Sequence, residues 1–318
     1  DWSSDVCSSD LAFLNILILM LVLASCASNP YSKTNREHKK QAKAYAKQLS
    51  KFPLPEKHNE SALNYGEYRV GTTNFNLRKP NYVVIHHTAQ DSVAQTLRTF
   101  TLPRTNVSSH YVIGRDGEVY QMLNDYFRAW HGGIGQWGNN TDLNSSSIGI
   151  ELDNNGFEEF SEAQIASLIE VLKILKEDYK IPAKNFIGHS DIAPSRKVDP
   201  NKTFPWERLA EEGFGLWYDE AEVNELKMEW EIFPPNRLKH FPARDLAQRI
   251  PFLDVLVFPE MIPNHFNIDL ALKIIGFDIS NPEAARKAFK LHFIQENTDL
   301  PLTQNEIKIL YHLQEKYL

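Results

Sequence analysis

The chain has 318 residues, of which 42% are hydrophobic and 24% charged, a composition typical of globular proteins and a length sufficient for more than one core. Its formal net charge of −7 and pI near 5.9 exclude a general nucleic-acid binder, so no nucleic-acid partner is expected. Both cysteines, Cys7 and Cys26, precede the globular part, which excludes an internal disulfide, a cysteine metal ligand or a cysteine nucleophile there.

The N-terminus carries an apolar run, LAFLNILILMLVLASC, that ends at Cys26. The run is too short for a transmembrane helix and is typical of a secretion signal, so residues 1–26 are interpreted as a signal segment. Leu-Ala-Ser-Cys resembles the bacterial lipobox, which implies lipidation of Cys26 and a periplasmic, membrane-anchored protein; Ala27 favours the outer membrane. The alternative is an anchor helix with an incidental cysteine. Because DWSSDVCSSD is acidic and lacks Met, about the first ten residues are interpreted as an assembly scar.

Residues 27–78 are expected to be a tether. The stretch REHKKQAKAYAKQLSK within it is polar and lysine-rich and has little apolar face. We therefore predict a solvated spacer with helical character, and adhesion to an anionic surface is the alternative.

A domain of the α/β class is predicted over residues 79–212, because strand and helix patterns alternate there. NYVVIHHT at 81–88 is a β-branched run that predicts a buried strand, and SVAQTLRTFTL at 92–102 predicts a helix. SHYVIGRDGEVYQML at 109–123 predicts a hairpin, since Asp-Gly favours its turn.

The second half of this domain contains SIGIELD at 147–153, which predicts another strand. Ser161 and Gln164 match an S-x-x-Q capping box, and apolar residues then recur at helical spacing as far as Tyr179. The predicted fold is a central mixed β-sheet flanked by helices.

Residues 213–263 are predicted to be a connecting region rich in proline and aromatic residues, and residues 264–318 a small three-helix bundle. Asn267, Asn281 and Thr303 each stand where an N-cap is expected, and Thr303 begins a second capping box.

Strand geometry separates the two histidines of the first predicted strand. Because side chains alternate faces, His86 and His87 point to opposite sides and cannot easily bind one metal together. In the strand at 147–153, Glu151 lies opposite an apolar face, which favours a cleft position. A lone strand histidine is more often structural than a ligand. Combined with Asp199, histidines of this domain match the three protein ligands that hydrolytic zinc commonly takes.

Five motifs occur in order over residues 81–206: VVIHHTA, SHYVIGRDG, AWHGG, SIGIEL and GHSDIAPSRKVDP. Together they resemble the zinc-dependent N-acetylmuramoyl-L-alanine amidases of the amidase 2 family, related to peptidoglycan recognition proteins. The resemblance implies that Zn²⁺ is bound by His86, His189 and Asp199. It also implies hydrolysis of the amide between N-acetylmuramic acid and L-alanine in peptidoglycan or muropeptides, with a role in cell-wall turnover or recycling.

The resemblance implies catalytic roles for Glu151 and Lys197. Zinc lowers the pKa of bound water from 15.7 toward roughly 7, and Glu151 would take its proton and pass it to the leaving amine. Lys197 would stabilise the oxyanion together with the metal. The alternatives are a surface ion pair for Glu151 and a solvated charge for Lys197.

Other residues near these motifs are given binding or structural roles. His131 and Trp130 are expected to line the substrate cleft, whereas His87 and His110 are interpreted as structural. Two further indoles are expected either to line the cleft or to pack in the core: Trp137 and Trp206.

The stretch NPEAARKAFKLHF resembles part of a peptidoglycan-binding bundle that follows some catalytic domains of this family, and a packing appendage is the alternative. Two other functions stay open. One is a non-catalytic peptidoglycan-binding protein, although such members typically lack the third ligand, which here is Asp199. The other is a zinc endopeptidase that acts on the stem peptide.

Overall fold

The computed structural model of the protein describes residues 29–50, 77–228, 261–296 and 298–318. Contacts between residues divide the chain into two units, 1–75 and 76–318, and each is described separately. The predicted signal segment with Cys26, part of the tether and most of the connecting region lie outside the described residues. Across the described ranges, no helix combines the length and apolar character that a membrane span requires.

In the first unit, a helix forms within the predicted tether. This helix, α2 (Ser32–Leu49), has no buried residue. Lys40 donates to Glu37 one turn earlier at 3.0 Å, and both side chains are exposed. The helix matches the predicted helical character of the spacer.

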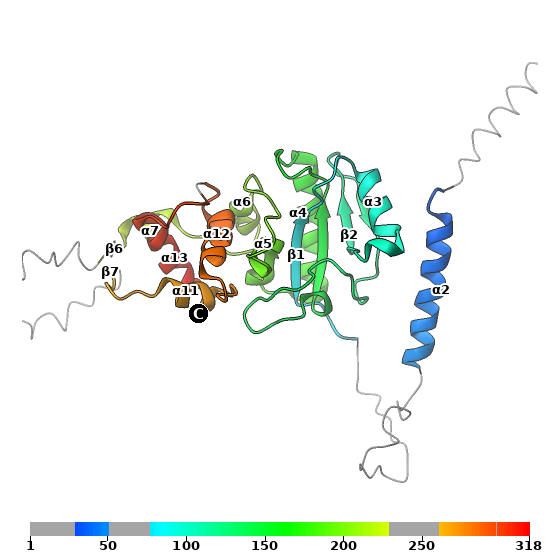
Figure 1. Cartoon of the computed structure of the whole chain (residues 1–318), viewed down its shortest axis with the longest axis horizontal. Coiled ribbons are helices and arrows are strands. Elements are labelled where there is room, and N and C mark those ends of the chain that lie inside the picture. Colours follow the sequence, from blue (N-terminus) through cyan, green and yellow to red (C-terminus); the bar gives the residue numbers. More distant parts are fainter. Residues whose placement is uncertain (1–28, 51–76, 229–260, 297) are drawn as a thin grey trace, which may run out of the picture. The chain divides into compact units, whose positions relative to one another are not determined.

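The second unit is built on a five-stranded sheet whose spatial order is β3-β2-β4-β1-β5. Four strands run parallel, and β3 pairs antiparallel with β2 as the edge strand. The predicted mixed sheet flanked by helices is therefore confirmed (Figure 1). The strands are β1 (Tyr82–His87), β2 (Tyr111–Ile113), β3 (Val119–Gln121), β4 (Ser147–Leu152) and β5 (Phe186–Gly188).

Helices connect and cover these strands. The predicted helices at 92–102 and after Ser161 are present, as are three helices at the C-terminal end. The bounds are α3 (Val93–Thr101), α4 (Glu162–Tyr179), α5 (His189–Ile192), α6 (Trp206–Glu211), α7 (Glu220–Glu225), α11 (Ile268–Ile275), α12 (Pro282–Phe293) and α13 (Gln304–Tyr317). The short strands β6 (Lys227–Met228) and β7 (Met261–Ile262) form a second, two-stranded sheet.

Helix α4 covers one face of the large sheet. Its apolar residues, such as Leu168 and Leu172, form a core with Val83 and Ile85 of β1. The capping box predicted at its start is only half correct. The Ser161 hydroxyl accepts from the backbone N–H of Gln164, but the Gln164 amide donates to carbonyls at the ends of β2 and β4. Gln164 thus supplies a side-chain donor to two backbone carbonyls, and that of Ile113 also accepts the N–H of Asp153.

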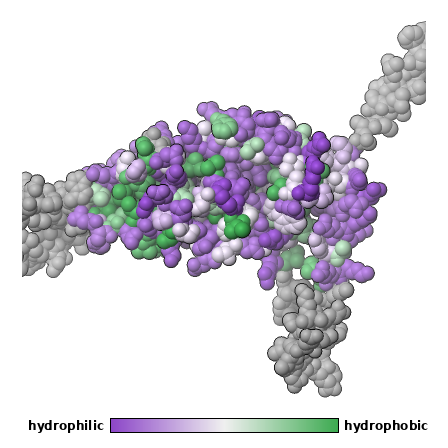
Figure 2. Space-filling view, in the orientation of Figure 1, coloured by the Kyte–Doolittle hydropathy of each residue, from purple (hydrophilic) through white to green (hydrophobic). Residues whose placement is uncertain are grey.

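The C-terminal helices pack over the opposite face of the sheet. Val84 of β1 and Ile187 of β5 share a core with Leu272 of α11, Phe289 of α12 and Leu313 of α13. The three helices thus bury apolar residues of the sheet that would otherwise contact water. Hydrophobic residues also remain visible at the surface beside α7 and α13, whereas most of the remaining described surface in this view is hydrophilic (Figure 2).

The N-caps predicted for these helices form. The side chains of Asn267, Asn281 and Thr303 each accept a backbone N–H of the first turn, and Glu306 completes the second capping box. The peptidoglycan-binding role expected for residues 264–318 stays a prediction.

Two tryptophans that were expected either to line the cleft or to pack in the core are both found in the core. Trp137 is 6% exposed and packs edge-on against Phe277. A Cβ on Gly276 would lie 2.5 Å from the Trp137 ring, so this close approach requires glycine. Trp206 is 2% exposed. Neither indole lines the cleft.

Candidate metal centre

Parallel strand pairing brings the predicted metal ligands together. His86 ends up beside Glu151 in the register of β1 with β4, and Ile85 is paired with Gly188, so His189 follows β5 next to His86. The carboxyl ends of parallel strands are where open α/β sheets bind ligands. The site is therefore formed by the topology of the sheet, and the loop after α5 adds Asp199.

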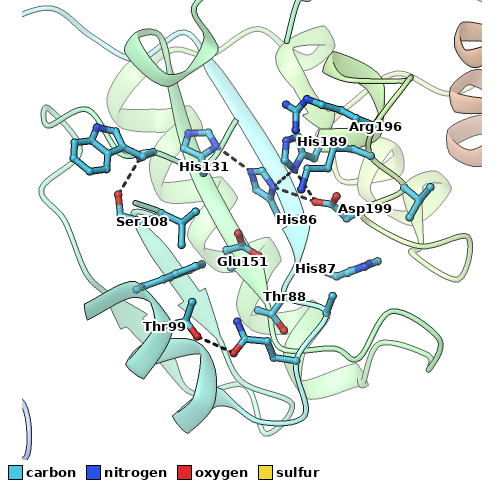
Figure 3. A pocket seen from close by; sticks show the side chains of 17 residues that line it. His86, His87, Thr88, Thr99, Ser108, His131, Glu151, His189, Arg196 and Asp199 are labelled. Carbon is cyan, nitrogen blue, oxygen red and sulfur yellow. Dashed lines mark hydrogen bonds and ion pairs between the residues drawn. The ribbon is translucent and has the colours of Figure 1, made fainter. Parts of the chain in front are cut away.

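Three ligand atoms converge at this edge (Figure 3). His86 Nδ1 lies 2.9 Å from His189 Nδ1 and 3.1 Å from Asp199 Oδ2, and His189 Nδ1 lies 3.0 Å from the same oxygen. All three residues are buried. Tetrahedral zinc with bonds of about 2.0–2.2 Å places its ligands roughly 3.3–3.6 Å apart, a few tenths of an ångström more than these separations.

The tautomer of His189 follows from its second ring nitrogen. Nε2 lies 3.0 Å from the carbonyl oxygen of Gly132, which can only accept a hydrogen bond. Nε2 must therefore carry the proton, and the neutral imidazole presents a lone pair at Nδ1, toward Asp199.

The tautomer of His86 follows from a longer chain of hydrogen bonds. The Ser147 hydroxyl donates to the carbonyl of Leu143, so its oxygen accepts from His131 Nε2 at 3.2 Å. His131 Nδ1 is then the acceptor for His86 Nε2, 3.0 Å away. His86 Nδ1 is left without a proton and faces the other two ligand atoms.

This arrangement fits a divalent cation. Two imidazole lone pairs and a carboxylate oxygen face one another at about 3 Å with no donor among them, which is unfavourable unless a proton or a cation lies between them. Two histidines and one carboxylate form a donor set that zinc uses in hydrolytic sites, where a fourth position stays open. His131 orients His86 through the ring nitrogen that does not face the metal position, as partners of metal-binding histidines commonly do.

The pKa values of two ligands, His86 and Asp199, are shifted by their surroundings. Burial, and next the charge on His189, lower the pKa of His86 to about 4, so the ring is neutral at pH 7. Burial raises the pKa of the Asp199 carboxyl, but the closeness of His189 and His86, whose Nδ1 atoms would donate to it if protonated, outweighs this and holds the pKa well below its usual range. Neutral imidazoles and an ionised carboxylate are the forms that bind metal.

The ligands open into a pocket of about 390 Å³ that Glu151 and Lys197 also line. Glu151 is 8% exposed; its burial, and next the Asp199 charge, raise its pKa to about 8, while Lys197 lowers it. Trp130 lies at the rim of the pocket with half its surface exposed, whereas His131 is nearly enclosed behind His86. Thr99 and Phe100 of α3 line the pocket on the other side.

In metal-free protein, Glu151→Gln is expected to become more stable relative to wild type as pH rises from 5 to 8. The Glu151 pKa is about 8 in the fold and 4.5 ordinarily, so the folded state binds the extra proton in this range. Its contribution to the free energy of unfolding is full below pH 4.5 and is lost as pH rises toward 8, by on the order of 3 kcal/mol. Urea unfolding of both proteins with chelator at each pH measures the difference, and an equal difference at both pH values would contradict it.

The two histidines interpreted as structural make hydrogen bonds to the backbone. His87 follows His86 on β1 and lines the edge of the same pocket, and its Nδ1 accepts the N–H of Asn201, two residues beyond Asp199 (Figure 3). His110 is fully buried; its Nε2 donates to the carbonyl of Phe127 and its Nδ1 accepts the N–H of Gly149.

Sequence patterns alone leave several supporting residues unidentified. Asn144 accepts the N–H groups of His131 and Gly132 at 3.1 and 2.8 Å, and Arg196 donates to the carbonyls of Gly132 and Ile134. These bonds position the loop that binds His189 Nε2. A Cβ on Gly149 would lie 2.4 Å from the His131 ring. A glycine inside a strand is a signal of such an approach; Asn144 and Arg196 carry no comparable signal.

The known proteins to which this sequence is similar are amidases. Residues 76–202 match the family described as N-acetylmuramoyl-L-alanine amidase. The N-acetylmuramoyl-L-alanine amidase AmiD of Escherichia coli is 39% identical over 158 residues, 45% of this chain and 56% of that protein. The 1,6-anhydro-N-acetylmuramyl-L-alanine amidase AmpD of Escherichia coli is 43% identical over 103 residues, 32% of this chain and 56% of that protein. The chain spans about half the length of these curated relatives.

Solved structures extend the similarity beyond the family match. AmpDh3 from Pseudomonas aeruginosa has a TM-score of 0.59 and 29% identity, covering 80% of this chain and 98% of that chain. AmiD from E. coli, in complex with the substrate anhydro-N-acetylmuramic acid-L-Ala-D-γ-Glu-L-Lys, has a TM-score of 0.59 and 27% identity, covering 80% of this chain and 97% of that chain. In sequence over residues 76–202, and in fold over most of its length, this chain is similar to bacterial N-acetylmuramoyl-L-alanine amidases.

Proposed function

We propose that the protein is a zinc-dependent amidase that hydrolyses the bond between N-acetylmuramic acid and L-alanine in peptidoglycan or muropeptides. The observation that carries the proposal is the convergence of His86 Nδ1, His189 Nδ1 and Asp199 Oδ2 within about 3 Å, while the other nitrogen of each imidazole is used as a donor. The amidases to which the chain is similar, two of them in complexes with anhydromuramyl peptides, support the substrate class.

Different residues of the pocket perform different steps of the proposed hydrolysis. A zinc ion bound by the three ligands would supply Lewis acidity toward water and the amide carbonyl. Glu151 accepts the proton of the attacking water and returns it to the leaving amine, a double role that suits a carboxyl whose pKa is raised toward neutrality. The Lys197 ammonium donates to the carbonyl oxygen as it gains charge. Trp130 at the rim offers an indole face to a sugar or a peptide.

Digestion of purified sacculi and of an anhydromuramyl peptide tests the proposal. We expect released peptides whose first residue is L-alanine, identified by mass spectrometry. A chelator is expected to stop the release and added Zn²⁺ to restore it, because the attacking water is bound by the metal ion and not by the three ligand residues. Retention on sacculi without release would identify a non-catalytic binding protein, and peptides cut within the stem would identify an endopeptidase.

We also propose that the protein is secreted to the periplasm and anchored by lipid at Cys26, at the outer membrane. The apolar run that ends in Leu-Ala-Ser-Cys supports this, with Ala27 after the cysteine. Incorporation of labelled palmitate that disappears in Cys26→Ser tests the anchor, and equal labelling of both proteins would rule it out.

A further inference from the structure

Helix α5 connects the sheet to the metal ligands. It begins at His189, directly after β5, and all four of its residues are buried. The Asp191 Oδ2 atom accepts the backbone N–H of Gly188 at 2.7 Å, which fixes the first turn around the residue that precedes His189. The orientation of the His189 ring therefore depends on where the Asp191 carboxylate lies.

The same carboxylate oxygen has a partner from the C-terminal helices. His292 Nδ1, on α12, lies 2.7 Å from Asp191 Oδ2. Because that oxygen also accepts from Gly188, Nδ1 is the donor. Asp191 is 0% exposed, and its other oxygen, Oδ1, has no hydrogen-bond partner among the described residues. Both hydrogen bonds found for this fully buried carboxylate are therefore made by Oδ2. Losing either of them would leave buried charge less well compensated and would destabilise the fold.

His292 is itself firmly positioned. Its ring stacks on Trp206 of α6, with ring centroids 3.8 Å apart and planes 14° from parallel. The ring is 3% exposed, and the neighbouring Phe289 and Phe293 of α12 belong to the core shared with the sheet. The position of α12 is thus transmitted to Asp191 through one short hydrogen bond.

We propose that His292 is a positioning residue of the metal centre, so that the C-terminal helices complete the site and do not merely accompany it. The inference rests on the metal centre proposed above. His292 acts on His189 through Asp191 and the first turn of α5, while Gly132 orients the same ring from the opposite side. Partners outside the ligand shell commonly contribute 10–100-fold to metal affinity.

The test compares three variants of the whole chain by competition for Zn²⁺ with a chromophoric chelator. His292→Ala is expected to weaken zinc binding about tenfold, the lower end of the range for outer partners. His292→Asn is expected to restore most of the affinity, because its amide N–H can lie where the imidazole Nδ1–H lies. His312→Ala is the matched control. That histidine is also buried in the C-terminal helices, but it accepts from the N–H of Asp219 and its ion pair is with Glu222 of α7.

Two further measurements separate positioning from folding. Thermal unfolding of metal-free protein identifies variants that are folded at the assay temperature. The absorption spectrum of Co²⁺ bound in place of zinc reports ligand geometry, and it is expected to change in His292→Ala and not in His312→Ala. Wild-type protein that does not bind zinc would defeat the proposed function. Tight zinc binding by wild type and folded His292→Ala alike, with identical Co²⁺ spectra, would overturn the role of His292 alone.

Discussion

Asp199→Asn is expected to weaken zinc binding by more than about 100-fold, beyond the effect of an outer partner, and to reduce hydrolysis in proportion to the zinc that is lost. Asparagine keeps the shape of the side chain but removes the negative charge that faces His86 and His189 at 3.1 and 3.0 Å. Zinc content after dialysis, together with the rate of release of L-alanine peptides, measures the effect.

Asp178→Asn is the matched control for Asp199→Asn. Asp178 is an exposed aspartate near the end of α4, so its amide variant is expected to keep both zinc and activity. If Asp199→Asn retained zinc as tightly as this control, the carboxylate would not be a ligand, and the proposed metal centre would be wrong.

Glu151→Gln is expected to lower the hydrolysis rate by about 10²- to 10⁴-fold with zinc binding unchanged. Glutamine is nearly isosteric, so the pocket keeps its shape, but an amide cannot take a proton from water at neutral pH. The separation of the two effects is informative, because Glu151 lines the pocket and does not belong to the three-ligand cluster. Single-turnover rates with an anhydromuramyl peptide, paired with a zinc titration, measure both.

The exposed Glu177 of α4 provides a control for the same chemical change. Glu177→Gln is expected to match wild type in rate and in zinc affinity. A rate for Glu151→Gln within a few-fold of this control would show that another group takes the proton from water.

Local sequence patterns predicted most elements of this fold because each is defined by nearby residues. The β-branched run before His86 and the Asp-Gly turn of the hairpin identify strands through side-chain period and turn chemistry alone. Asn267, Asn281 and Thr303 mark helix starts because an N-cap needs only a side chain and the next three N–H groups. Gln164 is the exception, since the carbonyls that it binds lie on two distant strands.

The environment of the site depends on contacts between distant segments, and sequence patterns do not show these. Alternation along β1 separates His86 from His87, but nothing local indicates that His131 contacts the far side of the His86 ring. The buried position of Trp206 could not be predicted for the same reason, because its stacking partner, His292, comes from the last third of the chain. The ligand set was predicted through resemblance of motifs, whereas the residues that orient those ligands became visible only in the fold.

The order of the strands has a consequence for when the chain could bind the proposed zinc ion. Strand β1 pairs with β4 and β5, which are synthesised much later. The pairing of Tyr82 with Ser147, and of Val83 with Phe186, cannot form until those later residues have been made. Such non-local pairings form late in folding. A partly synthesised or unfolded chain therefore has no preformed binding cage. If the polypeptide crosses a membrane before it folds, the proposed zinc ion would be bound only in the compartment of arrival.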